Sequence, residues 1–189
     1  MKIFIQHDMF IKANRVKYKF LIIPIIVIII NFVITLLNED SNSGLGSIIA
    51  LLFYFFILYT FRFKKVFSEP DEQIAFAPVN GLIANIVEKE TGTILTIDKQ
   101  FFAPCELVTS TNNDIINSLD TDSSQVSWKV EGPNKYIFID ETIEHQAAMI
   151  GILPGNAVCE IFIPNEYEIK IDKGTKVEAG FTELAILKN

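Results

Sequence analysis

The sequence predicts a mainly β protein preceded by an N-terminal α-helical transmembrane hairpin. Two apolar runs lie between residues 20 and 63, and the chain after residue 65 consists of short β-type runs separated by turn residues. A length of 189 residues leaves room for an anchor and one modest domain. We therefore expect a basic cytoplasmic N-terminal segment (1–19), the hairpin (20–63) and a cytoplasmic β-rich domain (64–189).

The first apolar run, residues 20–37, carries no charge. As a helix it would measure about 27 Å at about 1.5 Å per residue, close to the thickness of a bilayer core. The second run, residues 46–61, is shorter, so both a full span and a re-entrant segment stay open. A secretory signal peptide fits less well, because no small-residue cleavage site separates the two runs. Pro24 and Asn31 are interpreted as tolerated irregularities of a helix.

The charges around the hairpin predict its orientation. The turn between the runs, NEDSNSGL, holds two acids and no base, whereas basic residues flank the hairpin on both sides (Lys12, Arg15, Lys17 and Lys19 before it; Arg62, Lys64 and Lys65 after it). The positive-inside rule then places both termini and the β-rich domain in the cytoplasm. The expected location is a bacterial inner membrane.

The composition excludes several classes of function. The net charge is −7, and acidic residues outnumber basic ones after Phe67, which argues against nucleic acid as a partner. Cys105 and Cys159 have no CxxC spacing and the chain has two histidines, so no metal site is expected. A cytoplasmic domain keeps both thiols reduced.

Seven segments are predicted to be strands, and residues 111–124 a polar loop, while residues 143–152 are ambiguous between strand and helix. The predicted strands are residues 81–87, 93–98, 125–130, 135–140, 157–163, 167–172 and 183–188. The sequence around Pro78 and Gly81, together with the Lys173–Gly174 turn and the strand after it, is typical of a barrel-sandwich hybrid. In such folds the strand that opens with Pro-x-x-Gly pairs with the one that follows the Lys-Gly turn. A lysine in a tight hairpin, which would carry a biotinyl or lipoyl group, is absent.

The order of motifs along the chain resembles the short-chain form of phosphatidylserine decarboxylase, of which this sequence would be a degenerate member. After the paired apolar segments come VFSEPDEQI (66–74), APVNG (77–81), FFAPCELVTS (101–110) and KGTKVEAGFTELAIL (173–187), each in place of a family motif. The resemblance implies a barrel-sandwich-hybrid-like, phosphatidylserine-decarboxylase-like domain. It also implies a link to phospholipid metabolism.

In that family the chain cuts itself at a serine, which becomes a pyruvoyl group that forms a Schiff base with the substrate amine. The cut needs a hydroxyl, a base and an orienting carboxylate. The resemblance assigns the carboxylate to Asn80, the histidine to Val108 and the serine to the neighbourhood of Gly180, Phe181 and Thr182, where no serine occurs. We therefore expect no catalytic residues, no pyruvoyl group or other cofactor, and a pseudoenzyme.

Substitutes for these residues are weaker candidates. Dehydration of Thr182 would give a ketobutyryl rather than a pyruvoyl group. Cys159 is interpreted as a small buried hydrophobe, and His145 as a packed or surface residue. The acids Asp140, Glu141 and Glu144 are interpreted as a solvated face, and Trp128 as part of the core or of packing near the membrane.

The leading hypothesis is a membrane-anchored, non-catalytic protein whose partners are the lipid bilayer and the head groups of phosphatidylserine or phosphatidylethanolamine, or else a protein partner or a second copy of the chain. One alternative is an adaptor or scaffold with a lipoyl-like barrel in a transport or secretion assembly. Such adaptors usually have one span and a helical hairpin inside the barrel, neither of which is expected here. The other alternative is an active decarboxylase with displaced catalytic residues.

Overall fold

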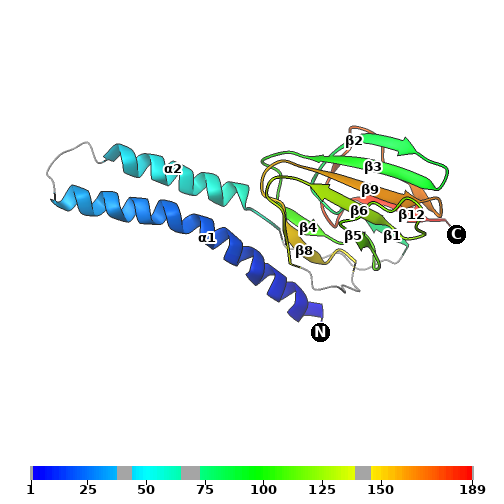
Figure 1. Cartoon of the computed structure of the whole chain (residues 1–189), viewed down its shortest axis with the longest axis horizontal. Coiled ribbons are helices and arrows are strands. Elements are labelled where there is room, and N and C mark those ends of the chain that lie inside the picture. Colours follow the sequence, from blue (N-terminus) through cyan, green and yellow to red (C-terminus); the bar gives the residue numbers. More distant parts are fainter. Residues whose placement is uncertain (1, 38–43, 65–72, 139–145, 189) are drawn as a thin grey trace.

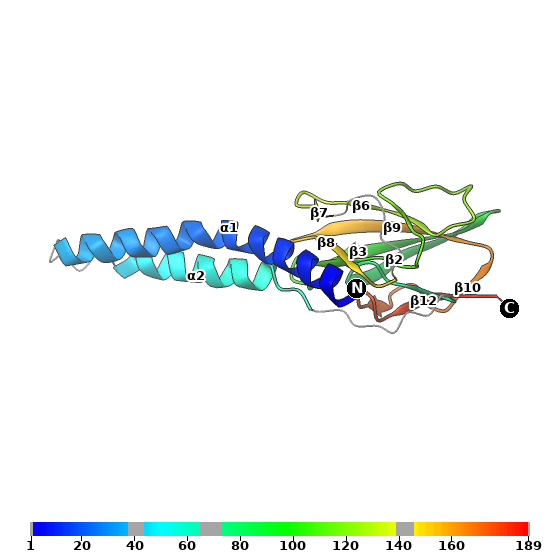
Figure 2. The same ribbon diagram turned by 90° about the horizontal axis from the view of Figure 1, so that it is seen from below.

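The computed structural model describes residues 2–37, 44–64, 73–138 and 146–188, which form a pair of helices and a β-rich part (Figure 1). Helices α1 (Lys2–Leu37) and α2 (Gly44–Thr60) lie side by side and project from one end of the β-rich part (Figures 1 and 2). α1 continues through Pro24 and Asn31. The described residues are thus a mixture of helix and sheet, and both of their helices lie in the N-terminal third of the chain.

α1 is the one helix among the described residues that is long and apolar enough to cross a membrane, judged by length and composition. α2 is also apolar, but its 17 residues fall short of the length needed to cross a membrane by the same measure. The two helices approach closely at Gly46, where an added Cβ would lie 2.9 Å from Nδ2 of Asn31. Small residues at such a contact let two membrane helices pack tightly. The expected pair of apolar helices is therefore present, whereas the crossing of a membrane by either helix stays a prediction.

The segment before the first apolar run continues into it without a break. Residues 2–19 form the first half of α1. Ala13 of this half and Leu21 just beyond it are buried in one apolar cluster with Ile57 of α2 and Met149 of the β-rich part. The ring of Phe10 also meets the ring of Phe63 edge to face at 5.0 Å. The sequence alone does not indicate this packing, because the apolar residues in this half of α1 are interspersed with basic residues.

The strands form three sheets. The largest has the order β11-β2-β3-β9-β6-β5, and its pairs are antiparallel except β5–β6. The other two have the orders β1-β12-β10 and β4-β8-β7. The strands are β1 (Ile74–Phe76), β2 (Gly81–Glu88), β3 (Gly92–Lys99), β4 (Glu106–Val108), β5 (Ile115–Ile116), β6 (Ser127–Glu131), β7 (Tyr136–Ile137), β8 (Met149–Ile152), β9 (Ala157–Pro164), β10 (Tyr167–Ile169), β11 (Lys176–Val177) and β12 (Glu183–Leu187).

Each of the seven predicted strand segments overlaps an observed strand, and residues 139 and 140 of one segment lie outside the described residues. The segment predicted as loop, 111–124, contains the two-residue strand β5. The ambiguous segment 143–152 ends in strand β8, and its first three residues are not described. Strands β1, β4 and β11 were not predicted, because runs of two or three residues are too short to show alternation.

The pairing expected of a barrel-sandwich hybrid is present between β2 and β11. Gly81 lies opposite Val177 and Leu82 opposite Lys176, so the strand after Pro78-x-x-Gly81 pairs with the strand after Lys173-Gly174. No sheet among the described strands closes into a barrel. The pairing is therefore shown, and the complete barrel is not.

The main core contains both Trp128 and Cys159. Trp128 is fully buried there, and its indole Nε1 donates to Oδ2 of Asp114 at 2.8 Å. Cys159 is fully buried in the same core as a free thiol, and burial raises its pKa. These positions agree with the interpretation of Trp128 as core and of Cys159 as a small buried hydrophobe.

Candidate functional site

Three segments that are far apart in the sequence meet at the end of the β-rich part near the helices. They contain APVNG (77–81), the start of β4, and the turn before β12. Val79 forms a β-bridge with Leu107, and the backbone N of Val108 donates to the carbonyl oxygen of Pro78 at 3.0 Å. The backbone N of Gly180 donates to the oxygen of Ala77 at 2.8 Å. The structure thus brings together the positions that the resemblance assigned to one site.

Asn80 cross-links these segments. Its Nδ2 donates to the carbonyl oxygen of Pro104 at 3.1 Å, and its Oδ1 accepts from the backbone N of Ala179 at 3.2 Å. The side chain also donates to the buried carboxyl of Glu106, and only 6% of Asn80 is exposed. An amide serves this position because it donates and accepts at once, whereas a carboxylate only accepts.

Val108 offers no proton acceptor. Its side chain is fully buried with Ala147 and Ala179 in a small apolar cluster beside Asn80. The position assigned to the family histidine is therefore occupied by packing between β4 and the turn before β12.

The turn before β12 is held by its own hydrogen bonds. The side-chain Oγ1 of Thr182 accepts from the backbone N of Glu178 at 2.8 Å. The backbone carbonyl oxygen of Thr182 accepts from the backbone N of Ala77 at 2.9 Å. Gly180 has a φ of 69°, a left-handed conformation that favours glycine. Phe181 is 49% exposed, so its ring points away from the buried cross-link. The hydroxyl nearest to the assigned serine position therefore closes a turn.

Behind Asn80 lie two buried ionisable groups that sequence patterns did not indicate. Lys99 is 2% exposed, and its Nζ donates to the carbonyl oxygens of Gln100, Ala103 and Gly155 at 3.3, 3.1 and 2.8 Å. Burial lowers the pKa of Lys99, while the nearby Cys105 and Glu106 act in the opposite direction. Alternation along β3 would have revealed Lys99, because it takes an inward position of that strand.

Glu106 is also buried, and its Oε2 accepts from the backbone N of Lys64 at 3.3 Å. Burial raises the pKa of Glu106, and the hydrogen bonds from Asn80 and Lys64 oppose that shift. Beside it, burial raises the pKa of the Cys105 thiol to about 12, so this thiol is a poor nucleophile. Residues 105 and 106 tie the segment after α2 to β4. The backbone N of Cys105 donates to the carbonyl oxygen of Arg62 at 2.9 Å.

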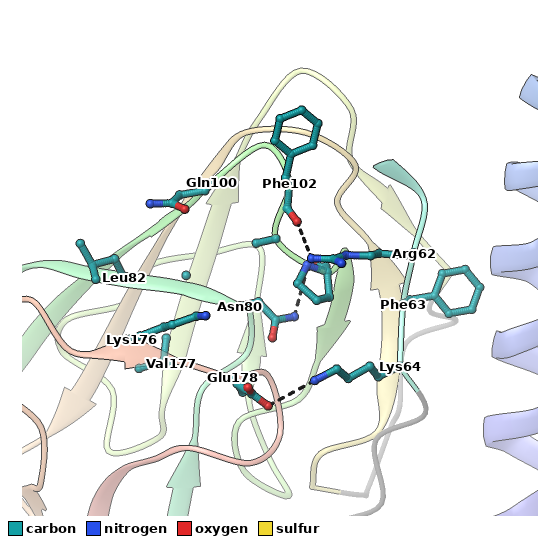
Figure 3. A pocket seen from close by; sticks show the side chains of 13 residues that line it. Arg62, Phe63, Lys64, Asn80, Leu82, Gln100, Phe102, Lys176, Val177 and Glu178 are labelled. Atoms are coloured by element: carbon teal, nitrogen blue, oxygen red, sulfur yellow. Dashed lines mark hydrogen bonds and ion pairs between the residues drawn. The ribbon is translucent and has the colours of Figure 1, made fainter. Parts of the chain in front are cut away.

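A pocket of about 540 Å³ opens in front of Asn80 (Figure 3). That volume lies within the range of small-molecule sites. Its lining residues come from the segment after α2, from the start of β2, from the turn after β3 and from β11 (Arg62, Phe63, Lys64, Asn80, Gly81, Leu82, Gln100, Phe102, Ala103, Pro104, Lys176, Val177 and Glu178). We call it the basic pocket, because three of these side chains are cationic and one is acidic.

The charges of the basic pocket are arranged on two sides. Lys64 pairs with Glu178 at 3.5 Å, and more than half of each side chain is exposed. Arg62 Nη2 donates to the carbonyl oxygen of Phe102 at 2.8 Å, and its guanidinium lies 4.3 Å from the ring centroid of Tyr59. In Figure 3 the amino group of Lys176 extends toward Asn80 from the opposite wall. An anion placed between these walls would face Arg62 and Lys176 together.

The other candidates, His145, Asp140, Glu141 and Glu144, lie outside the described residues. Across the described ranges, no group of three or more His, Cys, Asp or Glu side chains could hold a metal ion.

Comparisons with known proteins add no relative to this picture. No protein-family model, no curated protein and no solved structure matches the chain.

Proposed function

We propose that the chain is a membrane-anchored, non-catalytic protein with a phosphatidylserine-decarboxylase-like, barrel-sandwich-hybrid-like domain that binds phospholipid head groups in the basic pocket. One observation carries the proposal. An acidic protein of net charge −7 gathers three cationic side chains around one cavity, at the end of the β-rich part from which the apolar helices project. A general electrostatic attraction to anionic lipid is weak for such a protein, so a specific pocket is the better route to lipid.

The lining suits an aminophospholipid head group. Arg62 and Lys176 would hold the phosphate, because charge-assisted hydrogen bonds to phosphate are strong and Arg presents a fixed fork of donors. Glu178 supplies the one carboxylate of the lining, which suits the amine of serine or ethanolamine. Gln100 adds an amide that both donates and accepts.

The same residues argue against turnover. Self-cleavage to a pyruvoyl group requires a hydroxyl next to a base that a carboxylate orients. Thr182 closes a turn, Val108 is apolar, and Asn80 is committed to the backbone at Pro104 and Ala179. These contacts support a binding role for a site that keeps the family's segments together.

The orientation belongs to the proposal. The basic flanks of the hairpin favour a cytoplasmic pocket at a bacterial inner membrane. Thiol labelling of a cysteine introduced at Ser41, compared with one added at the C-terminus, tests it in intact cells. Labelling at position 41 alone is the expected result, and an externally labelled C-terminus would contradict it.

The binding test uses short-chain phosphatidylserine titrated into the detergent-solubilised full chain. Lys176→Gln should weaken binding, because a hydrogen bond to a charged group contributes about 1.5–3 kcal/mol, or roughly tenfold or more in affinity. Lys170→Gln is the matched control, since Lys170 pairs with Glu168 and does not line the pocket. Short-chain phosphatidylcholine and inorganic phosphate separate amine recognition from phosphate binding. Equal affinity of the parent and Lys176→Gln proteins would overturn the proposal.

A further inference from the structure

The turn that follows β3 carries two adjacent phenylalanines toward α2. The ring of Phe101 stacks on that of Phe56 at 5.7 Å, and the ring of Phe102 lies 5.4 Å from that of Tyr59. The two rings also contact each other at 5.0 Å. We call residues 100–103 the aromatic tip. Its outer ring, Phe102, is 51% exposed, so the contact with α2 covers only part of it.

The aromatic tip is held rigidly. The buried ammonium of Lys99 donates to the carbonyl oxygens of Gln100 and Ala103 within the tip and to Gly155 beneath it. The backbone N of Ala103 donates to the oxygen of Gln100 at 3.0 Å, which closes the turn. From the segment after α2, the Arg62 side chain donates to the carbonyl oxygen of Phe102. The exposed ring is therefore fixed beside the helix.

The length of α2 determines how deep the aromatic tip would lie in a bilayer that α2 crosses. Its 17 residues measure about 25 Å at about 1.5 Å per residue, less than the hydrocarbon core of about 30 Å. A crossing by α2 therefore uses the whole helix down to Tyr59 and Thr60. Phe101 and Phe102 contact the helix at Phe56 and Tyr59, within that last turn and a half.

We propose that the aromatic tip inserts into the bilayer, with Phe101 and Phe102 at the boundary between acyl chains and head groups. The inference rests on the membrane anchoring in the proposed function. Aromatic side chains favour this layer, and the neighbouring Arg62 and Lys64 suit the phosphates above it. The exposed face of Phe102 continues the exposed apolar surface of α2 formed by residues such as Phe55 and Phe56. The tip thus fixes the β-rich part against the membrane and sets the mouth of the basic pocket, which Phe102 also lines, at head-group level.

The test places an environment-sensitive NBD dye on Phe102→Cys in the full chain, reconstituted into phosphatidylcholine nanodiscs. A minor fraction of the lipid carries a nitroxide near the top of its acyl chain. Phe55→Cys on α2 is the control inside the bilayer, and Val87→Cys, exposed near the far end of β2, is the control in water. The native Cys105 and Cys159 are buried, so the dye reacts at the introduced thiol.

Position 102 should be quenched by the labelled lipid several-fold more than position 87 and to a similar degree as position 55. Quenching at 55 combined with water-like behaviour at 102 would overturn the inference and leave the anchor standing. Water-like behaviour at both would overturn the anchor and the inference together. Burial of position 102 against protein, shown by protection from both nitroxide lipid and aqueous iodide, would indicate a second copy of the chain at this surface and would also overturn it. Head-group binding in the pocket is measured separately, so its failure is distinguishable.

Discussion

The side-chain oxygen of Asn80 accepts a hydrogen bond from the backbone N of Ala179, 3.2 Å away and 99 residues later in the chain. The amide nitrogen of the same side chain donates to Pro104 and to Glu106. A side chain that donates on one side and accepts on the other therefore joins the start of β2 to β4 and to the turn before β12.

Asn80→Asp should destabilise the protein although it restores the residue of the resembled family. A carboxylate at this position still accepts the hydrogen bond from the backbone N of Ala179. It cannot donate to Pro104 or Glu106, so two acceptors lose their donor. The expected loss is about 1–3 kcal/mol, the penalty for buried polar groups left unsatisfied. Thermal unfolding of the detergent-solubilised chain measures it, with Asn85→Asp on the exposed side of β2 as control. Because a protonated carboxyl donates again, the loss should shrink as the pH falls. A neutral effect of Asn80→Asp at pH 7 would contradict the cross-link.

Lys99→Met should destabilise the aromatic tip by about 1–3 kcal/mol, because three carbonyl oxygens lose their donor. It should also change the pH dependence of stability. The pKa of Lys99 is lowered in the folded protein from 10.5, so above the folded value the unfolded chain binds more protons. Stability then rises with pH between the lowered pKa and 10.5, and Lys99→Met removes that rise.

Thermal unfolding measured from neutral pH up to about 10.5, the ordinary pKa of a lysine, tests this prediction. Lys89→Met, at an exposed position after β2, should retain the parent's pH dependence. Parallel profiles for the parent and the Lys99→Met protein would rule out the assigned role.

The purified protein should remain one chain of 21.4 kDa and release no carbon dioxide from phosphatidylserine. Members of a catalytic unit act non-additively, so restoring only Asp at Asn80 or only His at Val108 should recover no activity. Intact mass spectrometry decides this. Two fragments, with a C-terminal piece whose blocked end reacts with hydroxylamine, would show that a pyruvoyl group forms.

The sequence predicts the parts of this fold that local pattern controls. The apolar run 20–37 lies within α1, and the Pro78-x-x-Gly81 and Lys173-Gly174 segments pair as β2 and β11. The packing of Ala13 and Val16 against the β-rich part could not be predicted, because it depends on strand β8, which is distant in the chain and only four residues long.

The basic pocket shows the same limit. Arg62 follows α2, whereas Lys176 belongs to a two-residue strand near the end of the chain. Neither has a neighbour in the sequence that marks it as part of a site. Their proximity follows from the β2–β11 pairing and from the bonds that tie Arg62 to Cys105 and Phe102.

The position of β12 has a consequence for how the molecule assembles. This late strand lies at the centre of its sheet, with β1 on one side and β10 on the other, and β1 is the first strand of the β-rich part. A ribosome must therefore release the chain through residue 187 before β1 finds its partner, by which time both apolar helices have long been synthesised. Pairings of such high contact order form slowly. Nascent chains should pass through a state that is already anchored while β1 still presents an open edge, and this is the interval in which a chaperone or a protease would meet the protein.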